Sequence, residues 1–335
     1  MKHDDLLDDF RIMMNIRRSL LALTGWLWAA CVFAQSEAYP TRPITLVVPF
    51  PPGGPTDASA RLIGKEMASS LGQPVVIENR AGAGGTVGSS AVAKAVPDGY
   101  TLLWGGTSSL VVAPALYPQL SYDPVKSFAP IGMVVRGPMM LAGKASLAPK
   151  NLVEVLALAK TQKLSYGSAG AGSIGHLAGE LFQESHQTDL LHVPYRGGAL
   201  ALNDLLGGQI DLIFETAQFM APHIKAGKVQ AYAVAGHKRY PGLPDVPTLH
   251  ELQPRTAFEA YSWFGLVAPA NTPRAVLSTL EKSLQKTMAD PAILAQVTAS
   301  GFEPVNSQAD FLAQAMASDL KKWRELVQRR NIKPD

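Results

Sequence analysis

The chain has 335 residues, of which 47% are hydrophobic and 17% are charged, with a formal net charge of +3 at pH 7. This length exceeds the usual size of one domain, so we expect two domains, and the low charged fraction excludes a disordered chain. Lysine and arginine never occur in runs longer than a pair, such as Arg17-Arg18. A nucleic-acid-binding surface needs a clustered basic stripe, so we expect no nucleic-acid partner.

The N-terminal segment has the pattern of a secretory signal peptide. Arg17-Arg18 precede an apolar run over residues 20–33, and Ala34 ends the segment with a small residue. The run is shorter than the roughly 18–20 apolar residues that a membrane-spanning helix needs. We therefore expect residues 1–34 to be a cleaved signal peptide and the mature protein to be periplasmic.

Two details of this segment bear on its maturation. Four aspartates before residue 10 are atypical of a signal peptide, which indicates that the true start is Met13 or Met14. The only cysteine, Cys31, falls inside the segment. The mature protein would then have no thiol and no disulfide, as suits an oxidising compartment. Lipidation at Cys31 stays open, although Trp28 stands where lipoprotein signals usually carry leucine.

From residue 39 onward, short apolar runs alternate with helical patterns. Ile44–Val48 is a nearly continuous apolar run, typical of a strand buried on both faces of a parallel sheet. Further strands are expected over residues 75–77 and 101–104. One helix between these strands ends at Gly72, and another covers residues 85–95. This β-α-β-α-β order predicts a doubly wound sheet.

The same alternation returns in the second part of the chain. Strands are expected over residues 164–167, 190–193, 210–214 and 229–235, with helices that start near Asn151, Ser173, Ala199 and Ala217. A last strand over residues 264–268 precedes three helices, the longest of which opens at Ser307.

No long linker separates the two parts, so the chain should pass between them by short crossings, near Met139 and near Tyr261. This predicts domain 1 over residues 35–139 plus 261–335, and domain 2 over residues 140–260.

Four loops that follow expected strands are rich in glycine and hydroxyl side chains. They cover residues 49–57, 79–86, 105–109 and 167–173. At the carboxyl ends of parallel strands such loops face the ligand crevice, and the helices that follow offer free N–H groups and positive dipole ends. A single loop of this kind could equally be a tight turn with no ligand. Four together favour a site that holds an anion without lysine or arginine.

Patterns of catalysis and cofactor binding are incomplete. Gly170, Gly172 and Gly175 match the G-x-G-x-x-G of dinucleotide folds, but the next strand ends in Tyr195-Arg196, where that fold needs an acid. No serine stands in G-x-S-x-G, and no P-loop lysine follows the glycine runs. The histidines do not show metal-ligand spacing. We therefore expect no enzymatic activity, no cofactor and no metal.

Ten segments give the chain a specific resemblance. They are Tyr39–Ile44, Val48–Asp57, Val76–Gly85, Pro97–Thr101, Tyr122–Lys126, Tyr166–Gly170, His192–Gly198, Pro222–Gly227, Leu243–Thr248 and Ala268–Pro273. With them, the chain after residue 39 resembles the Bug-type (TctC-like) extracytoplasmic solute receptors, the substrate-binding components of tripartite tricarboxylate transporters.

The resemblance implies a fold and a function. The fold is α/β, a two-domain Venus-flytrap periplasmic binding protein of type II, in which each domain is a doubly wound, mainly parallel sheet flanked by helices. The implied function is that of a monomer that captures a small organic carboxylate in the cleft between the domains. It would deliver this ligand to the membrane subunits of a tripartite tricarboxylate transporter.

The resemblance also implies the ligand contacts. Family members hold a ligand carboxylate on backbone N–H groups of the first glycine loop, and the other loops complete the pocket. The expected ligand-binding residues are Phe50, Gly53, Gly54, Thr56, Asp57, Thr107, Ser108, Ser168, Ala169, Gly172, Ser173, His176, Tyr195, Arg196 and Glu215. For His176, a role as a helix cap stays equally open.

Glu215 departs from the family pattern, in which the strand ending at Phe214 commonly leads into aspartate. A buried, unpaired carboxylate costs on the order of several kcal/mol, so Glu215 should face solvent, cap the next helix or meet a donor on the ligand. An ammonium or polar N–H at the far end of the ligand would be such a donor. A plain dicarboxylate would be repelled unless Arg196 or a water intervenes.

Two other functions remain alternatives to transport. A ligand-sensing receptor for a signalling partner would use the same closed conformation with a different docking partner. A periplasmic enzyme on the same fold is less favoured, because the sequence offers no recognisable nucleophile, base or metal site.

Overall fold

The computed structural model describes residues 39–117, 119–254 and 258–333. By their internal contacts the residues divide into two units, 1–41 and 42–335. Of the first unit only residues 39–41 are described, and they form no helix or strand. The predicted signal peptide, including Cys31 and the two alternative start residues, lies outside the described residues. The architecture below is that of residues 42–335.

One half of the sheet is built from parallel strands and the helices that connect them. Its first elements are β1 (Ile44–Val48), α2 (Pro55–Leu71), β2 (Val75–Asn79), α3 (Thr86–Ala93) and β3 (Thr101–Gly106). The strand order β2-β1-β3 places β1 in the middle, where its apolar run is buried as predicted. Helix α2 ends at Gly72, whose φ of +69° favours glycine.

Short helical turns lie in two of the glycine-rich loops. They are η1 (Ala83–Gly85) and η2 (Ser108–Val112), the latter continued by α4 (Ala113–Leu116).

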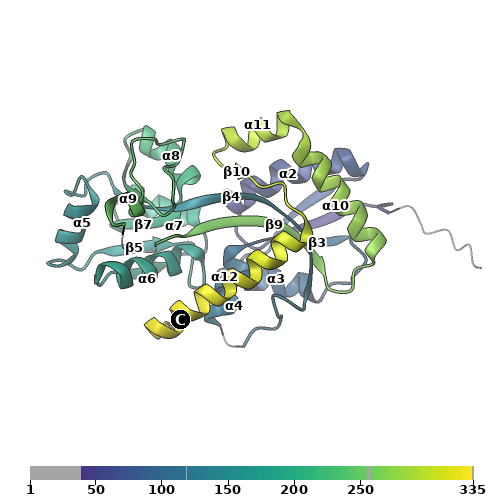
Figure 1. The fold of residues 1–335 in the computed structure, drawn as a ribbon, viewed down its shortest axis with the longest axis horizontal. Coiled ribbons are helices and arrows are strands. Elements are labelled where there is room, and N and C mark those ends of the chain that lie inside the picture. Colours follow the sequence, from purple (N-terminus) through teal and green to yellow (C-terminus); the bar gives the residue numbers. More distant parts are fainter. Residues whose placement is uncertain (1–38, 118, 255–257, 334–335) are drawn as a thin grey trace, which may run out of the picture. The chain divides into compact units, whose positions relative to one another are not determined.

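Two long antiparallel strands connect this half to the other. They are β4 (Phe128–Lys144) and β9 (Tyr261–Pro269). From Phe128 to Pro138, β4 pairs with β9, and from Met139 onward it pairs instead with β7 (Leu212–Thr216) on one edge and β8 (Val229–Val234) on the other. The strand β4 therefore belongs to both halves, as Figure 1 shows.

The second half repeats the α/β pattern around parallel strands in the order β7-β5-β6. Its remaining elements are α5 (Leu152–Ala159), β5 (Ser165–Ser168), α6 (Ile174–His186), β6 (Leu191–Pro194), α7 (Gly198–Leu206), α8 (Ala217–Lys225) and α9 (Leu249–Leu252). Helices α6, α7 and α8 each follow a strand of this half, so their first turns lie near the carboxyl ends of those strands.

The C-terminal elements return to the first half. They are α10 (Arg274–Ala289), α11 (Pro291–Ala299), β10 (Glu303–Pro304) and α12 (Ala309–Arg330). Helix α12 buries Leu312, Met316, Leu320 and Trp323, and Figure 1 shows it as the yellow helix that runs diagonally across the view. Its last turn reaches α6, where Arg329 and Arg330 form ion pairs with Glu184 and Glu180.

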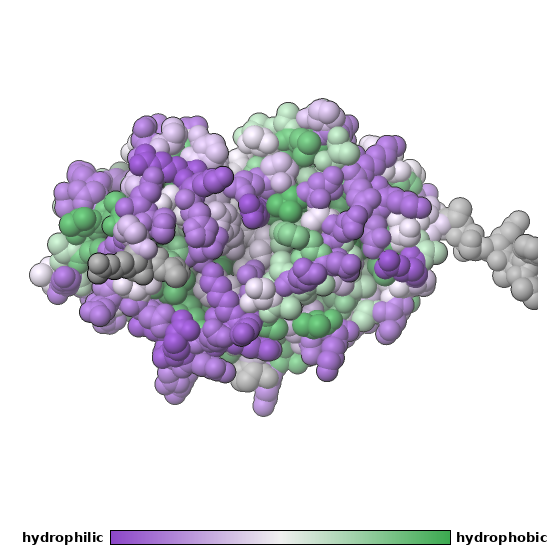
Figure 2. Space-filling model, in the orientation of Figure 1, coloured by the Kyte–Doolittle hydropathy of each residue, from purple (hydrophilic) through white to green (hydrophobic). Residues whose placement is uncertain are grey.

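Hydrophilic residues cover most of the face seen in Figure 2, with apolar residues scattered between them. No helix among the described residues is both long enough and apolar enough to cross a membrane.

Candidate functional site

A cavity lined by residues of the glycine loops lies where the two halves of the sheet meet. It encloses about 810 Å³ of empty space, its open mouth included. Its polar side chains are Thr56, Ser108, Ser173, Glu215 and Ser262. The rest of the wall is glycine, alanine, proline and the larger apolar residues Phe50, Ile174, Leu200 and Phe264. We call this space the main cavity.

The first glycine loop forms one wall of the main cavity and is held from below by Asp57. Two polar groups donate to this buried carboxylate, the Gly53 N–H at 3.1 Å and the Asn79 amide at 2.9 Å, and Arg61 pairs with it at 2.9 Å. Burial alone would raise the pKa of Asp57, but these hydrogen bonds outweigh it and hold the pKa below its usual value. Asn79 also donates to the Phe50 carbonyl at 2.9 Å. Asp57 therefore shapes the loop, and its carboxylate is fully engaged within the protein.

The loop at residues 168–173 forms the opposite wall, and part of it points away from the cavity. The Ser168 hydroxyl lies 2.7 Å from Nε2 of His192, whose ring stacks on that of His176 with centroids 4.1 Å apart. Burial, assisted by the neighbouring His176, lowers the pKa of His192 to about 3. These side chains lie behind the loop as a buried support, and only Ala169 and Ser173 of the predicted loop residues reach the main cavity.

Three helices begin at the wall of the main cavity. Residues of their first turns line it, from Gly54 to Thr56 for α2, from Ser173 to Gly175 for α6 and from Gly197 to Ala199 for α7. The first N–H groups of a helix have no partner within the helix, and they carry the positive end of its dipole. No side chain caps α2 or α7. These two helix ends thus present N–H donors to the cavity.

The start of α6 is occupied differently. The Ser173 hydroxyl caps this helix by accepting from the His176 N–H at 3.3 Å, and the Ile174 N–H donates to the Ser108 hydroxyl at 3.0 Å. The second bond joins loops from the two halves of the sheet. His176 therefore does not cap the helix with its side chain. Its backbone N–H is the donor to the Ser173 cap, and its ring stacks on His192 behind the loop.

Glu215 is the only ionisable residue among the described residues that line the main cavity. Its side chain is 6% exposed, so it does not face solvent. The carboxylate accepts a hydrogen bond from the Thr216 N–H at 2.7 Å, but Thr216 is itself the N-cap of α8 and no side chain caps that helix. Burial raises the pKa of Glu215 to about 7.

A second cavity, with about 1180 Å³ of empty space including its open mouth, adjoins the first and shares Phe50, Pro51 and Ala169 with it. We call it the side cavity. Tyr195 and Arg196 line this side cavity and not the main one. Next to it, Gly84 approaches the Ala171 carbonyl so closely that a Cβ at Gly84 would lie 2.6 Å from that oxygen. Since Gly84 also has a φ of +63°, glycine is required there on two grounds.

The predicted binding residues thus fall into three groups. The main cavity is lined by Phe50, Gly54, Thr56, Ser108, Ala169, Ser173 and Glu215. Tyr195 and Arg196 lie in the side cavity. The remaining residues lie outside the lining of both cavities; they are Gly53, Asp57, Thr107, Ser168, Gly172 and His176. Thr107 is an example of a side chain that is used within the protein, because its hydroxyl accepts a hydrogen bond from the Trp263 N–H at 2.9 Å.

Several lining residues were not predicted. Gly197 and Gly198 follow the predicted Tyr195-Arg196 turn and bring the start of α7 to the cavity. The glycine pair before a helical pattern was a usable signal for them. Ser262 and Phe264 come from β9, and no local motif marks them. Among the described residues, no group of three or more His, Cys, Asp or Glu side chains is placed to hold a metal ion.

Comparison with known proteins gives consistent matches over most of the chain. Residues 59–332 match the family described as "Tripartite tricarboxylate transporter family receptor". The UPF0065 protein in the tcbD-tcbE intergenic region of Pseudomonas sp. (strain P51) is 38% identical over 314 residues, 93% of each chain.

Solved structures agree with this match. The periplasmic binding protein BugD is 40% identical with a TM-score of 0.84, over 88% of this chain and 99% of that one. Two proteins of Rhodopseudomonas palustris are also similar. Rpa4515 with adipate is 31% identical with a TM-score of 0.85, over 89% of this chain and 100% of that one. MatC with bound malate is 36% identical with a TM-score of 0.82, over 86% of this chain and 100% of that one.

Proposed function

This chain belongs to the tripartite tricarboxylate transporter receptor family, and from that premise we propose that it captures a small organic carboxylate in the main cavity and delivers it to the membrane subunits of such a transporter. Members of the family are solute-binding proteins and not enzymes. The fold class agrees with the expectation, because the similar structures are periplasmic binding proteins of the same α/β architecture.

The proposal rests on one observation: helices begin at the wall of the main cavity, and this wall has no cationic side chain among its described residues. Among the described lining residues there is no lysine, arginine or histidine. The uncapped first turns of α2 and α7 nevertheless supply N–H donors and positive dipole ends. Such an arrangement suits a carboxylate, which accepts several hydrogen bonds. The bound adipate and malate of the two similar receptors are carboxylates as well.

The proposed domains follow the strand pairing. Domain 1 comprises residues 35–139 plus 261–335, and domain 2 comprises residues 140–260. The partner exchange of β4 between Pro138 and Met139 and the start of β9 at Tyr261 support these crossings. Closure of the two domains around the ligand would form the binding state, with the protein acting as a monomer. Light scattering of the purified protein tests the monomer, and a stable dimer would contradict it.

Export to the periplasm is part of the same proposal. Residues 1–34 are the proposed signal peptide, cleaved after Ala34. The family match and the similarity to periplasmic binding proteins support this location. N-terminal sequencing of periplasmic material tests it, and an intact first residue would contradict cleavage.

A thermal-shift screen with malate, adipate and related small acids tests the proposed binding. A ligand at 100 times its Kd adds about 2.7 kcal/mol to the stability of the folded state. We expect at least one acid to raise the unfolding midpoint, while glucose, a neutral solute of similar size, leaves it unchanged. The absence of any shift across the acids at millimolar concentration would contradict the proposal.

A further inference from the structure

Glu215 has an unusual position for a carboxylate. It stands near the end of β7, is 6% exposed and lines the main cavity. One oxygen, Oε1, accepts from the Thr216 N–H at 2.7 Å. The other, Oε2, lies against Gly198 at the start of α7, and both residues line the cavity.

No cation within the described chain compensates this carboxylate. The other described residues that line the main cavity carry no charge. Gly198 of α7, Met140 of β4 and Thr216 at the start of α8 lie against Glu215, and all three are uncharged. Asp57, by contrast, is equally buried but receives three donors. Glu215 therefore keeps acceptor capacity that the protein itself does not use.

Two features favour the ionised form of Glu215 once a ligand supplies a partner. The one hydrogen bond that it makes comes from a backbone donor, so the carboxylate acts as an acceptor. It also lies beside the starts of α7 and α8, where the helix dipoles favour negative charge. Burial opposes ionisation and raises the pKa to about 7. A cation placed in the cavity would reverse that shift.

We infer that the ligand carries a protonated amino group that pairs with Glu215, so that the substrate class is the amino acids and not the plain carboxylic acids. This inference rests on the proposed function, since the ligand carboxylate would occupy the donors at the starts of α2 and α7. The ligand would then lie with its carboxylate on these N–H groups and its ammonium on Glu215. The apolar wall from Phe50, Ile174, Leu200 and Phe264 would contact its carbon skeleton.

Matched pairs of acids test this assignment, because the members of each pair differ only in the amino group. The pairs are L-aspartate and succinate, L-glutamate and glutarate, L-2-aminoadipate and adipate, and L-phenylalanine and 3-phenylpropanoate. Calorimetric titration at pH 7.5 should show at least one amino acid binding 10-fold or more tightly than its partner. In Glu215→Gln, which preserves the shape of the side chain, that preference should vanish. The affinity for the plain acid should change less than 3-fold.

A control variant and a pH series complete the test. Glu259→Gln, at a carboxylate that precedes β9 and does not line the main cavity, should keep the preference for the amino acid. Between pH 8 and pH 6 the affinity for the amino acid should fall about 10-fold, because only the ionised fraction of Glu215 is competent to bind it. A plain acid held by protonated Glu215 would instead bind more tightly as the pH falls.

Each outcome is decisive. Plain acids that bind as well as their amino partners in the wild type, or an amino-acid preference that survives Glu215→Gln, would overturn the inference while leaving carboxylate binding intact. If no member of any pair binds, both the inference and the proposed function fail.

Discussion

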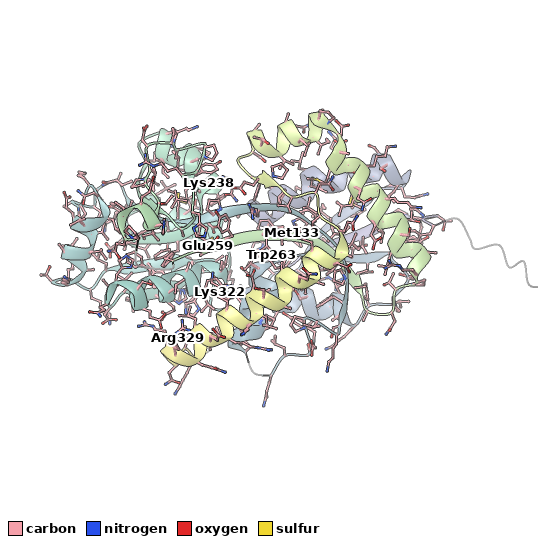
Figure 3. All side chains as sticks on the ribbon, in the orientation of Figure 1. Met133, Lys238, Glu259, Trp263, Lys322 and Arg329 are labelled. Atoms are coloured by element: carbon pink, nitrogen blue, oxygen red, sulfur yellow. The ribbon has the colours of Figure 1, made fainter. Side chains whose placement is uncertain are left out.

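The two faces of β9 carry cavities of different character. Side chains alternate along a strand, and Ser262 and Phe264 line the main cavity whereas Tyr261 and Trp263 line a cavity on the opposite face, beside α12. In this α12 cavity the charged groups are paired within the protein. Lys322 donates to the Glu259 carbonyl at 2.6 Å, and Figure 3 labels both residues together with Trp263 and Met133 of the same cavity.

The other charges of the α12 cavity are paired in the same way. Asp319 accepts from the indole N–H of Trp263 at 2.8 Å, and Arg136 pairs with Glu303 at 2.7 Å. In the main cavity Glu215 accepts from the Thr216 N–H, and no cation among the described lining residues pairs with it. This difference is the one we expect between a cavity that stabilises the fold and a cavity that offers groups to a ligand. The number of charged residues alone would have pointed to the α12 cavity as the ligand site.

The largest effect should follow from a side chain at Gly54. A Cβ there would meet no protein atom within 4 Å and φ is not positive, so the fold tolerates valine. The same side chain would fill the cavity where the ligand must approach the backbone N–H groups of α2. Gly54→Val should therefore weaken ligand binding by roughly 100-fold or more, about 2.7 kcal/mol, in a calorimetric titration. Ala58→Val, at an exposed position of the same helix, should bind as the wild type does; unchanged affinity in Gly54→Val would exclude this loop as the anchor.

The α12 cavity should show the opposite behaviour, a loss of stability without a loss of affinity. Asp319→Ala removes the acceptor of the buried Trp263 indole N–H. An unsatisfied buried donor costs roughly 1–3 kcal/mol, which urea unfolding would measure. Asp319→Asn keeps an oxygen at the same place and should lose less. A change in ligand affinity that exceeds the change in stability would show that the two faces are not separate.

A smaller effect should appear on acidification, through His192. Its pKa is about 3 in the folded protein and about 6.5 when unfolded. Between these values the unfolded chain binds more protons, so stability falls as the pH falls. From pH 7 to pH 5.5 this histidine should contribute a loss of about 1 kcal/mol. The loss should be smaller by that amount in His192→Gln, measured by urea unfolding at both pH values; equal losses in both proteins would contradict a buried neutral His192.

The sequence predicts the parallel strands well because their apolar runs are continuous and their ends carry glycine or proline. It fails at β4, the longest strand of the described chain. Pro130 and Pro138 interrupt its pattern, since proline normally excludes a central strand. Both prolines lie where the pairing with β9 shifts or ends. Tertiary pairing with β9 and β7 therefore forms this strand against its local preference.

The sequence located the loops of the site, but it identified only some of the side chains that line the cavity. Three of the four glycine loops line the main cavity and the loop at residues 79–86 lines the side cavity, because their place after strands of a parallel sheet follows from chain order. Which hydroxyls face the cavity does not follow from chain order. Ser168 turns toward His192, a partner 24 residues away, and Thr107 toward β9. Phe264 reaches the cavity through pairing of β9 with β3 across more than 150 residues. Such long-range contacts have no local signature.

The contact between Gly198 and Glu215 has a consequence for the evolution of this site. A methyl group at position 198 would overlap Oε2 of Glu215. The two positions should therefore change together among homologous sequences. A glutamate at position 215 should occur with glycine at 198, whereas alanine at 198 should occur with a shorter residue at 215. In this protein alanine at 198 would push the Glu215 carboxylate to another position in the cavity, so position 198 offers a second route by which ligand preference can change.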